Sequence, residues 1–373
     1  MAAHSTQDSN TRSGGVLAPV NTTLDTTRID DLRIKAVRPL ISPAILHEEH
    51  PVPPASQALI ESARRDIASI LHGQSERLVV VVGPCSVHDY DQAIDYGQRL
   101  AGLMPQVEDA LLIVMRVYFE KPRTTVGWKG FINDPQLDGS FRINQGLRQA
   151  RRLLLDLAAL GVPAGTEFLD MLSPQYIADL VAWGAIGART TESQSHRQLA
   201  SGLSCPIGFK NGTEGSVRVA TDAIVAAGAS HAFIGMTKMG QAAVFETRGN
   251  QDCHLILRGG RQPNYDRASI ESAWTEMVRS GLSNRLMVDC SHANSAKQHQ
   301  KQLEVLADLG AQLAEGERRL GGVMIESHLN PGRQDLAARD ALEYGVSITD
   351  ACIGWQDTEA ALHSLAQAVR NGT

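Results

Sequence analysis

The chain has 373 residues, of which 43% are hydrophobic and 20% charged, and its formal net charge is −6. These values are ordinary for a protein with a full hydrophobic core and exclude a chain dominated by disorder. A negative net charge argues against nucleic-acid binding, which normally shows as a basic excess. No apolar run reaches the length of a membrane span, and residues 1–15 contain no apolar signal segment. We therefore expect a cytoplasmic protein that binds neither nucleic acid nor membrane.

The N-terminal part of the chain differs in composition from the rest. Residues 1–27 are rich in Ser, Thr, Asn and Gly and predict a disordered tail. Residues 28–55 mix short apolar runs with several prolines, which predicts an N-terminal arm followed by a linker. The main domain is expected to occupy residues 56–373.

The main domain alternates segments of helical periodicity with short apolar runs that have the length of buried strands. It begins with apolar residues at helical spacing over residues 56–71. Further helices are predicted at residues 145–160, 174–183, 216–227, 270–280 and 296–313. Strands are predicted at residues 78–83, 111–116, 162–168, 185–189, 206–210, 231–235, 286–289 and 322–326.

Eight strands with helices between them predict an α/β fold, a closed (β/α)8 TIM barrel. An open doubly wound sheet is the alternative, but it usually carries a GxGxxG turn after its first strand, where this chain has GPCSVHD. Residues 237–265 are too long for a simple loop and contain two apolar runs. This stretch is predicted to be an inserted β-hairpin.

Most of the predicted strands end in a polar or ionisable side chain. In a parallel barrel these ends meet at the mouth, where active sites lie. Guanidinium and ammonium groups match phosphate oxygens in geometry and charge, so the cationic members predict a site for more than one phosphate group. The alternative is a solvated basic edge. The cationic members are Arg116, Lys121, Arg123, Arg189 and Lys210, joined by Arg258 from the predicted hairpin.

A second group of strand-end residues has the chemistry of metal ligands. Cys85, His292, Glu326 and the later Asp350 offer a thiolate, an imidazole and two carboxylates. Such a set suits Mn2+, Fe2+, Zn2+ or Co2+ better than Mg2+. Two simpler roles are open, since Cys85 fits a small buried hydrophobe and Asp350 fits a turn cap. The five cysteines are odd in number and widely spaced, which argues against a disulfide framework.

Long blocks of the sequence, in the same order, resemble the type I 3-deoxy-D-arabino-heptulosonate 7-phosphate (DAHP) synthases, in their microbial feedback-regulated branch. The resemblance extends from about residue 30 to the C-terminus. The blocks are GPCSVHD, MRVYFEKPRTTVGWKGFINDP, GTEFLD, IGARTTESQSHRQLASGLSCPIGFKNGT, DCHLILRGGRQPNY, VDCSHANSAK, GVMIESHL and GVSITDACIGW.

The resemblance implies a metal-dependent condensation of phosphoenolpyruvate with erythrose 4-phosphate, on a barrel with an N-terminal extension and a β-hairpin. The product is DAHP, with release of phosphate, at the first step of the shikimate pathway. Carried over to matching positions, Cys85, His292, Glu326 and Asp350 would bind the metal. Arg116, Lys121, Arg189, Lys210 and Arg258 would bind phosphoenolpyruvate, Arg123 and Thr124 would bind erythrose 4-phosphate, and Glu167 joins the substrate-binding residues. Lys121, with Cys85 and His292, is assigned a catalytic role, and Lys121 is placed to donate a proton to the forming hydroxyl.

The same resemblance implies feedback inhibition by an aromatic amino acid away from the barrel mouth. Gly235 falls where a choice between Ser and Gly accompanies phenylalanine or tyrosine sensitivity, and glycine leaves room for a tyrosine hydroxyl, which predicts inhibition by tyrosine. A homodimer or homotetramer is expected. The effector-site residues implied are Asp30, Asp31, Leu199, Leu203, Ser204, Phe233 and Gly235.

Two other functions are weighed against this one. The sister synthase that makes 3-deoxy-octulosonate 8-phosphate from arabinose 5-phosphate shares the barrel and the phosphoenolpyruvate chemistry, but carries a KANRS-type loop where this chain has KPRTT. A non-catalytic sensor of phosphorylated metabolites is the second alternative. A sensor that only binds such metabolites does not need a redox-sensitive thiolate ligand, so a metal set beside two phosphate sites argues against this alternative.

Overall fold

The computed structural model describes residues 29–372, in two units that divide after Ile41. The predicted tail at residues 1–27 lies outside the described residues. The segment 29–41 contains a turn, in which the Ile34 amide donates to the Asp31 carbonyl at 3.0 Å, and has no helix or strand. The unit that begins at Ser42 contains all the elements described below.

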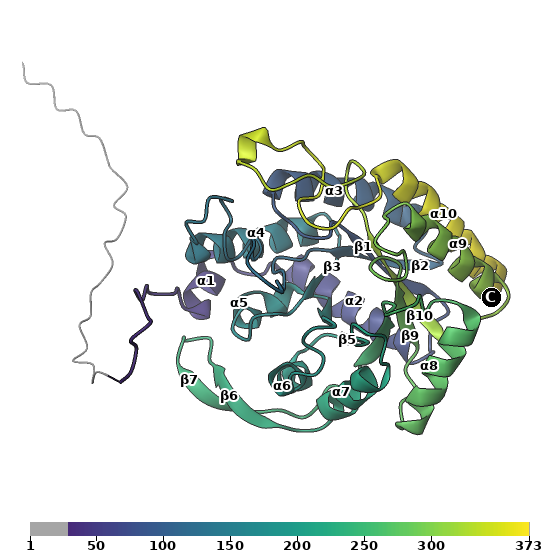
Figure 1. Cartoon of the computed structure of the whole chain (residues 1–373), viewed down its shortest axis with the longest axis horizontal. Coiled ribbons are helices and arrows are strands. Elements are labelled where there is room, and N and C mark those ends of the chain that lie inside the picture. Colours follow the sequence, from purple (N-terminus) through teal and green to yellow (C-terminus); the bar gives the residue numbers. More distant parts are fainter. Residues whose placement is uncertain (1–28, 373) are drawn as a thin grey trace, which may run out of the picture. The chain divides into compact units, whose positions relative to one another are not determined.

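Within residues 42–372, eight parallel strands close into a barrel in the order β1-β10-β9-β8-β5-β4-β3-β2, with helices around it (Figure 1). The strands are buried on both faces, as expected of parallel strands covered by helices. The predicted α/β TIM barrel is therefore confirmed. The barrel strands are β1 (Leu78–Gly83), β2 (Leu111–Arg116), β3 (Ala164–Glu167), β4 (Trp183–Ile186), β5 (Ile207–Lys210), β8 (His254–Leu257), β9 (Leu286–Asp289) and β10 (Leu320–Glu326).

The helices bury one apolar face each and often begin at a capping side chain. Asp89 accepts the Gln92 amide at 3.0 Å at the start of α3, and Asp266 accepts the Ser269 amide at 3.0 Å at the start of α8. The α-helices are α1 (Pro43–Glu49), α2 (Pro54–Leu71), α3 (Tyr90–Leu103), α4 (Ile143–Ala159), α5 (Pro174–Ile177), α6 (Gln194–Gly202), α7 (Arg218–Gly228), α8 (Arg267–Arg279), α9 (Lys301–Ala314) and α10 (Trp355–Gly372). Short 3-10 helices are η1 (Met104–Gln106), η2 (Ala178–Leu180) and η3 (Arg339–Ala341).

The inserted hairpin is present, but the prediction assigned the wrong strands to it. The hairpin consists of β6 (Ala232–Met236) and β7 (Ala242–Glu246), paired antiparallel outside the barrel, and not of residues 237–265. The run at 231–235, predicted as a barrel strand, is the first hairpin strand, and Ile234 is 85% exposed there. β8, predicted inside the hairpin, pairs with β5 and β9 of the barrel. Both runs are short and apolar, so the pattern alone does not distinguish them.

Two predicted helices also differ from the structure. Residues 174–183 contain only the short α5 and η2 before the chain enters β4, so the long helix predicted there is wrong. The helix predicted at 296–313 begins at Lys301, because Ala296 and Lys297 have positive φ values of 50° and 60°, which a right-handed helix does not allow. Among residues 29–372, no helix combines the length and apolar character that crossing a bilayer requires.

Candidate functional site

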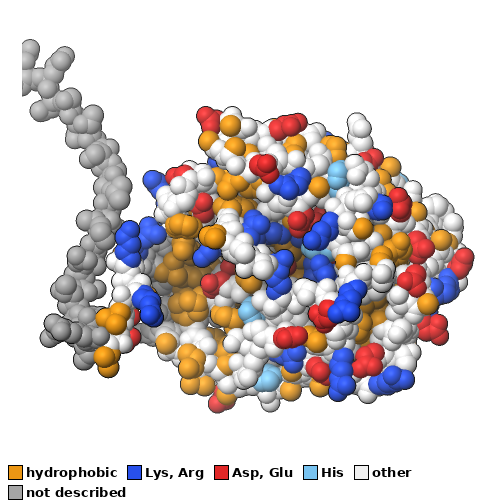
Figure 2. Space-filling view, in the orientation of Figure 1, with side chains coloured by type: hydrophobic (Ala, Val, Ile, Leu, Met, Phe, Trp, Pro, Cys, Tyr) orange, Lys and Arg blue, Asp and Glu red, His pale blue; other side chains and the backbone are white. Residues whose placement is uncertain are grey.

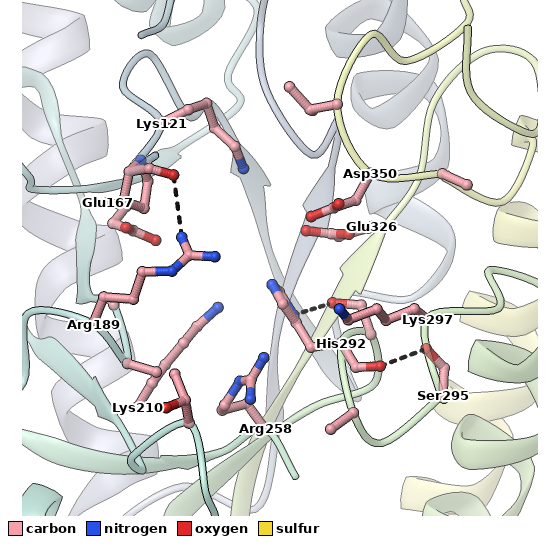
Figure 3. Close-up of a pocket in the computed structure, with 18 of the residues that line it drawn as sticks. Lys121, Glu167, Arg189, Lys210, Arg258, His292, Ser295, Lys297, Glu326 and Asp350 are labelled. Carbon is pink, nitrogen blue, oxygen red and sulfur yellow. Dashed lines mark hydrogen bonds between the residues drawn. The ribbon is translucent and has the colours of Figure 1, made fainter. Parts of the chain in front are cut away.

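A cavity of about 630 Å3 lies at the mouth of the barrel and receives side chains from the C-terminal ends of the strands. Figure 2 shows Lys and Arg side chains gathered around a hollow on this face. In Figure 3, one side of the space carries Lys121, Arg189, Lys210 and Arg258, and the other side carries His292, Lys297, Glu326 and Asp350. The predicted substrate residues that line it are Arg116, Lys121, Arg123, Glu167, Arg189, Lys210 and Arg258.

Arg116 ends β2 and is held at the base of the cavity. Its side chain is 1% exposed, and its guanidinium donates from Nη2 to Glu326 Oε1 at 3.0 Å and from Nε to the Pro84 carbonyl at 3.1 Å. Its Cζ atom lies 3.5 Å from the ring centroid of Tyr118. Among the described residues, its buried Nη1 has no hydrogen-bond partner. A buried guanidinium donor of this kind is available for an anionic ligand.

Lys121 lies in the loop that follows β2 and reaches the thiol of Cys85. Its Nζ donates to Cys85 Sγ at 3.2 Å and to the Cys85 carbonyl at 3.1 Å. Burial raises the pKa of the Cys85 thiol to about 11, with Glu326 adding to the rise and Lys121 opposing it. The free thiol therefore stays protonated near neutral pH, and a bound cation is needed to stabilise the thiolate.

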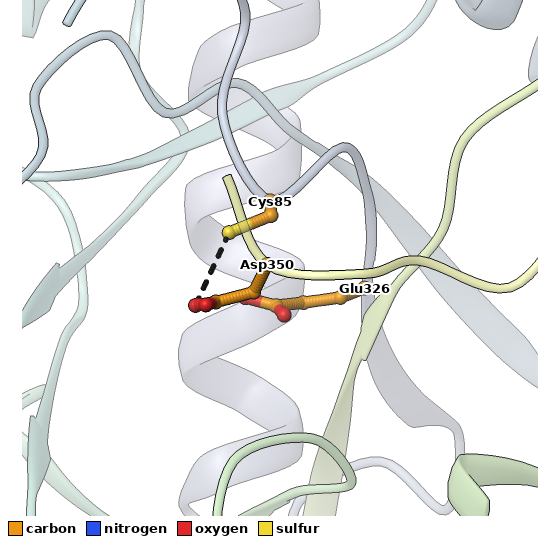
Figure 4. A group of neighbouring side chains, drawn as sticks. All are labelled: Cys85, Glu326 and Asp350. Carbon is orange, nitrogen blue, oxygen red and sulfur yellow. Dashed lines mark hydrogen bonds between the residues drawn. The ribbon is translucent and has the colours of Figure 1, made fainter. Parts of the chain in front are cut away.

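Three of the four predicted metal ligands are brought together. One ligand atom from each of Cys85, Glu326 and Asp350 lies within 4.8 Å of the others, and Cys85 Sγ is 3.6 Å from Asp350 Oδ2 (Figure 4). A thiol and two carboxylates in a small volume carry mutual repulsion once ionised, which a divalent cation would offset. The donor set thus fits the Mn2+, Fe2+, Zn2+ or Co2+ type of ion predicted from the sequence.

His292 lies on the wall of the same cavity, but it is outside this three-residue cluster. Its Nδ1 contacts Ser291 Oγ at 2.6 Å and Asp289 Oδ2 at 3.0 Å. Its backbone has a positive φ of 58°, an uncommon conformation for a residue other than glycine. Such strain is found mostly where function requires a fixed geometry.

The remaining cationic residues lie at different depths. Lys210, at the end of β5, is 3% exposed, and its Nζ is 2.8 Å from Asp289 Oδ2. Arg189 is exposed and donates from Nη1 to the Pro122 carbonyl at 3.1 Å. Burial lowers the pKa of Arg258 from its ordinary value, with Arg189 acting in the same direction and Asp289 opposing it. Positive charge is therefore spread from the floor of the cavity to its rim.

The KPRTT loop forms part of the rim. Arg123 is exposed and is oriented by a hydrogen bond from its Nε to the Trp128 carbonyl at 2.7 Å. Thr124 is exposed and does not line the cavity. Lys297 and Arg333 do line it, although the sequence analysis did not single them out. Both lie in loops away from the strand ends, so the pattern of polar residues at strand ends does not predict them.

Comparison with known families identifies this barrel. The model described as "DAHP synthetase I family" matches residues 52–363. The chain belongs to this family. The resemblance seen in the sequence blocks is therefore confirmed.

Known relatives align with almost the whole length of this chain. It is 56% identical over 341 residues to the Phe-sensitive phospho-2-dehydro-3-deoxyheptonate aldolase of Escherichia coli (strain K12), covering 91% of this chain and 97% of the relative. It is 49% identical to the tyrosine-inhibited enzyme of the same name from Schizosaccharomyces pombe, over 95% of this chain and 97% of the relative. The structure of the Francisella tularensis SCHU S4 aldolase superposes with a TM-score of 0.89 at 48% identity, covering 91% of this chain and 99% of that one.

A second cavity, of about 830 Å3, lies between the β6–β7 hairpin and the helices of the barrel. Phe233 and Phe245 stack across the hairpin with ring centroids 6.0 Å apart. Asp30 and Asp31 belong to the separate segment 29–41. The predicted effector-site residues that line the cavity are Leu199, Leu203, Ser204, Phe233 and Gly235.

Proposed function

We propose that this chain is a 3-deoxy-7-phosphoheptulonate synthase, a transferase that condenses phosphoenolpyruvate with erythrose 4-phosphate to give DAHP and inorganic phosphate. The observation that carries the proposal is the cationic cavity at the barrel mouth, which is lined by Glu326 and Asp350, the two carboxylates that cluster with Cys85. Relatives that match nearly the full chain are named for the same product.

The cationic residues answer the main physical difficulty of this reaction, which joins two phosphorylated anions. Arg116 and Lys210 are buried and would hold phosphoenolpyruvate at the base, with Lys121, Arg189 and Arg258 around it. Their charges offset the repulsion between the substrates and fix their orientation. Arg123 and Thr124 at the rim would receive the phosphate of the sugar.

A divalent metal held by Cys85, His292, Glu326 and Asp350 would supply Lewis-acid polarisation of the aldehyde oxygen. The enol carbon of phosphoenolpyruvate forms the new carbon–carbon bond to the aldehyde, whose oxygen must then gain a proton. Lys121 lies beside the cluster, with its Nζ 3.2 Å from Cys85 Sγ, and is the proposed donor of that proton. Water adds at the second carbon of the former phosphoenolpyruvate, and phosphate leaves from it.

The test is phosphate release from phosphoenolpyruvate, measured with the purified full chain and each of two sugar phosphates. Release with erythrose 4-phosphate that a chelator abolishes and Mn2+ restores is the expected result. Release only with arabinose 5-phosphate would identify the sister synthase instead. Binding of phosphoenolpyruvate without release in either mixture would support the sensor and overturn the proposal.

We further propose that the second cavity binds an aromatic amino acid as a feedback inhibitor, with tyrosine preferred. The relatives include Phe-sensitive, Trp-sensitive and tyrosine-inhibited forms, so the names alone do not select one. Gly235 favours tyrosine, because a Cβ atom at this position would lie 2.8 Å from the Phe245 ring and narrow the cavity. Inhibition by phenylalanine but not by tyrosine would refute this preference. The cytoplasmic location and the homodimer or homotetramer stay predictions from the sequence.

A further inference from the structure

Asp289 lies between two residues of the proposed site, although neither the pattern of strand-end residues nor the family resemblance gives it a role. It ends β9 and is 0% exposed. Its Oδ2 atom lies 2.8 Å from Lys210 Nζ and 3.0 Å from His292 Nδ1. Its Oδ1 atom accepts hydrogen bonds from the amide of Ser291 at 3.0 Å and from the Ser291 hydroxyl at 2.6 Å.

These contacts determine which nitrogen of His292 carries the proton. An ionised carboxylate only accepts, so the single hydroxyl proton of Ser291 is committed to Asp289 Oδ1. The Ser291 oxygen, 2.6 Å from His292 Nδ1, must then accept from that nitrogen. Asp289 Oδ2 is a second acceptor at the same nitrogen. Both contacts require the hydrogen on Nδ1, which leaves the lone pair on Nε2.

We infer that Asp289 is a positioning residue that holds His292 in the Nδ1-protonated tautomer and directs its Nε2 lone pair toward the metal cluster. This inference rests on the proposed role of His292 as a metal ligand. Metal-binding histidines are commonly oriented by a carboxylate on the other ring nitrogen, which fixes the tautomer and raises the basicity of the ligand. Lys210 contributes by offsetting the charge of the buried carboxylate, which would otherwise be unfavourable at this depth.

The backbone that follows β9 has an uncommon conformation, and Asp289 contacts it. His292, Ala296 and Lys297 all have positive φ values, of 58°, 50° and 60°. Asp289 also fixes this turn through its own carbonyl, which accepts from Asn294 Nδ2 at 2.8 Å. An Asp289→Asn change keeps the backbone contact and the side-chain volume. The amide NH2 of asparagine would replace one of the two carboxylate oxygens. In one orientation it faces the Lys210 ammonium and the hydrogen on His292 Nδ1, and in the other it faces the Ser291 hydroxyl.

The experiment measures Mn2+ binding to the metal-free full chain, without substrate or turnover. Asp289→Asn is expected to raise the Kd for Mn2+ at least tenfold, within the 10- to 100-fold range typical for loss of such a partner. In a His292→Ala background, Asp289→Asn should not change the Kd further, because Asp289 is proposed to affect the metal only through the His292 ring. Glu317→Gln is the matched control, since Glu317 is 5% exposed, accepts from Arg319 Nε at 2.8 Å, and lies outside the mouth cavity.

The possible results separate the two assignments. An unchanged Kd for Asp289→Asn, with a weakened Kd for His292→Ala, would overturn the role of Asp289 alone. Equal weakening by Asp289→Asn in both backgrounds would also overturn it, because Asp289 would then act by another route. If His292→Ala binds Mn2+ as tightly as the unmodified chain, the proposed ligand set fails first.

A second measurement, on the unmodified, metal-free chain, reports the tautomer of His292 without any metal binding. Nitrogen-15 NMR of the 12 histidines, with His292 assigned by its loss in His292→Ala, reports which ring nitrogen carries hydrogen in the neutral form. Protonated Nδ1 at His292 supports the inference. Protonated Nε2 overturns it, whatever the variants show.

Discussion

Glu120 offers a test of the electrostatics around the substrate loop that does not depend on the assigned reaction. The side chain is 4% exposed and accepts a hydrogen bond from the Ser173 hydroxyl at 2.9 Å. Burial, and then the charge of Asp170, raise the pKa of Glu120 from its ordinary value of 4.5 to about 7. Its contribution to stability is therefore fully present below pH 4.5 and is lost as the pH rises through 7. The variant Glu120→Gln does not titrate and should lose less stability over this range.

The size of the effect follows from the rise in pKa. One pKa unit corresponds to about 1.4 kcal/mol, so a rise from 4.5 to about 7 gives a total of about 3 kcal/mol. At pH 5 somewhat under 1 kcal/mol of this stabilisation has already been lost, because the Glu120 carboxyl of the unfolded chain is mostly ionised at that pH. Between pH 5 and pH 8.5, the unmodified chain should thus lose roughly 2 to 3 kcal/mol of stability relative to Glu120→Gln. Any change in stability that the glutamine side chain causes equally at both pH values cancels in this comparison.

Urea unfolding followed by tryptophan fluorescence at both pH values measures this difference. A gap between the two proteins that is the same at pH 5 and pH 8.5 would refute the reasoning. Ser173→Ala removes a donor to the ionised carboxylate, so it should move the loss of stability to higher pH. Glu315→Gln is the control, since Glu315 is 68% exposed and should show no comparable dependence.

Three further predictions concern activity. Lys121→Met should lower turnover by at least about 100-fold, as expected for loss of a proton donor, and single-turnover kinetics with most of the rate retained would exclude that role. Arg123→Ala should raise the KM for erythrose 4-phosphate far more than the KM for phosphoenolpyruvate, and steady-state kinetics showing equal changes would contradict the division of the two sites. Gly235→Ser should weaken tyrosine inhibition at least tenfold, because the added atoms meet the Phe245 ring, whereas an unchanged inhibition curve would remove Gly235 from the effector site.

The sequence predicted the barrel and most of the mouth residues for one physical reason. Parallel strands buried on both faces appear as short apolar runs, and the first polar residue after each run marks the C-terminal end of a strand. Arg116, Lys210 and Glu326 were all found in this way, and all line the cavity. The rule needs only local sequence, because closure of the barrel brings the ends together.

The errors came from features that local sequence does not contain. The apolar runs HAFIG and HLIL look alike, and only their tertiary surroundings make one a hairpin strand and the other a barrel strand. The positive φ values of Ala296 and Lys297 likewise shortened a predicted helix without any glycine or proline to signal them. The anchoring of His292 by Asp289 depends on side-chain geometry after folding, so the sequence showed the two residues but not their connection.

The position of the Cys85, Glu326 and Asp350 cluster has a consequence for how the protein is made. β1 and β10 are neighbours in the barrel, with Gly83 paired to Glu326, so the cluster spans the seam where the first and last strands meet. A nascent chain still lacking its final segment has Cys85 but neither carboxylate. A divalent ion at this seam would therefore be loaded only after synthesis has delivered the C-terminal strand. The bound ion would then link the first strand to the C-terminal part of the chain, so metal binding would indicate that the barrel has closed.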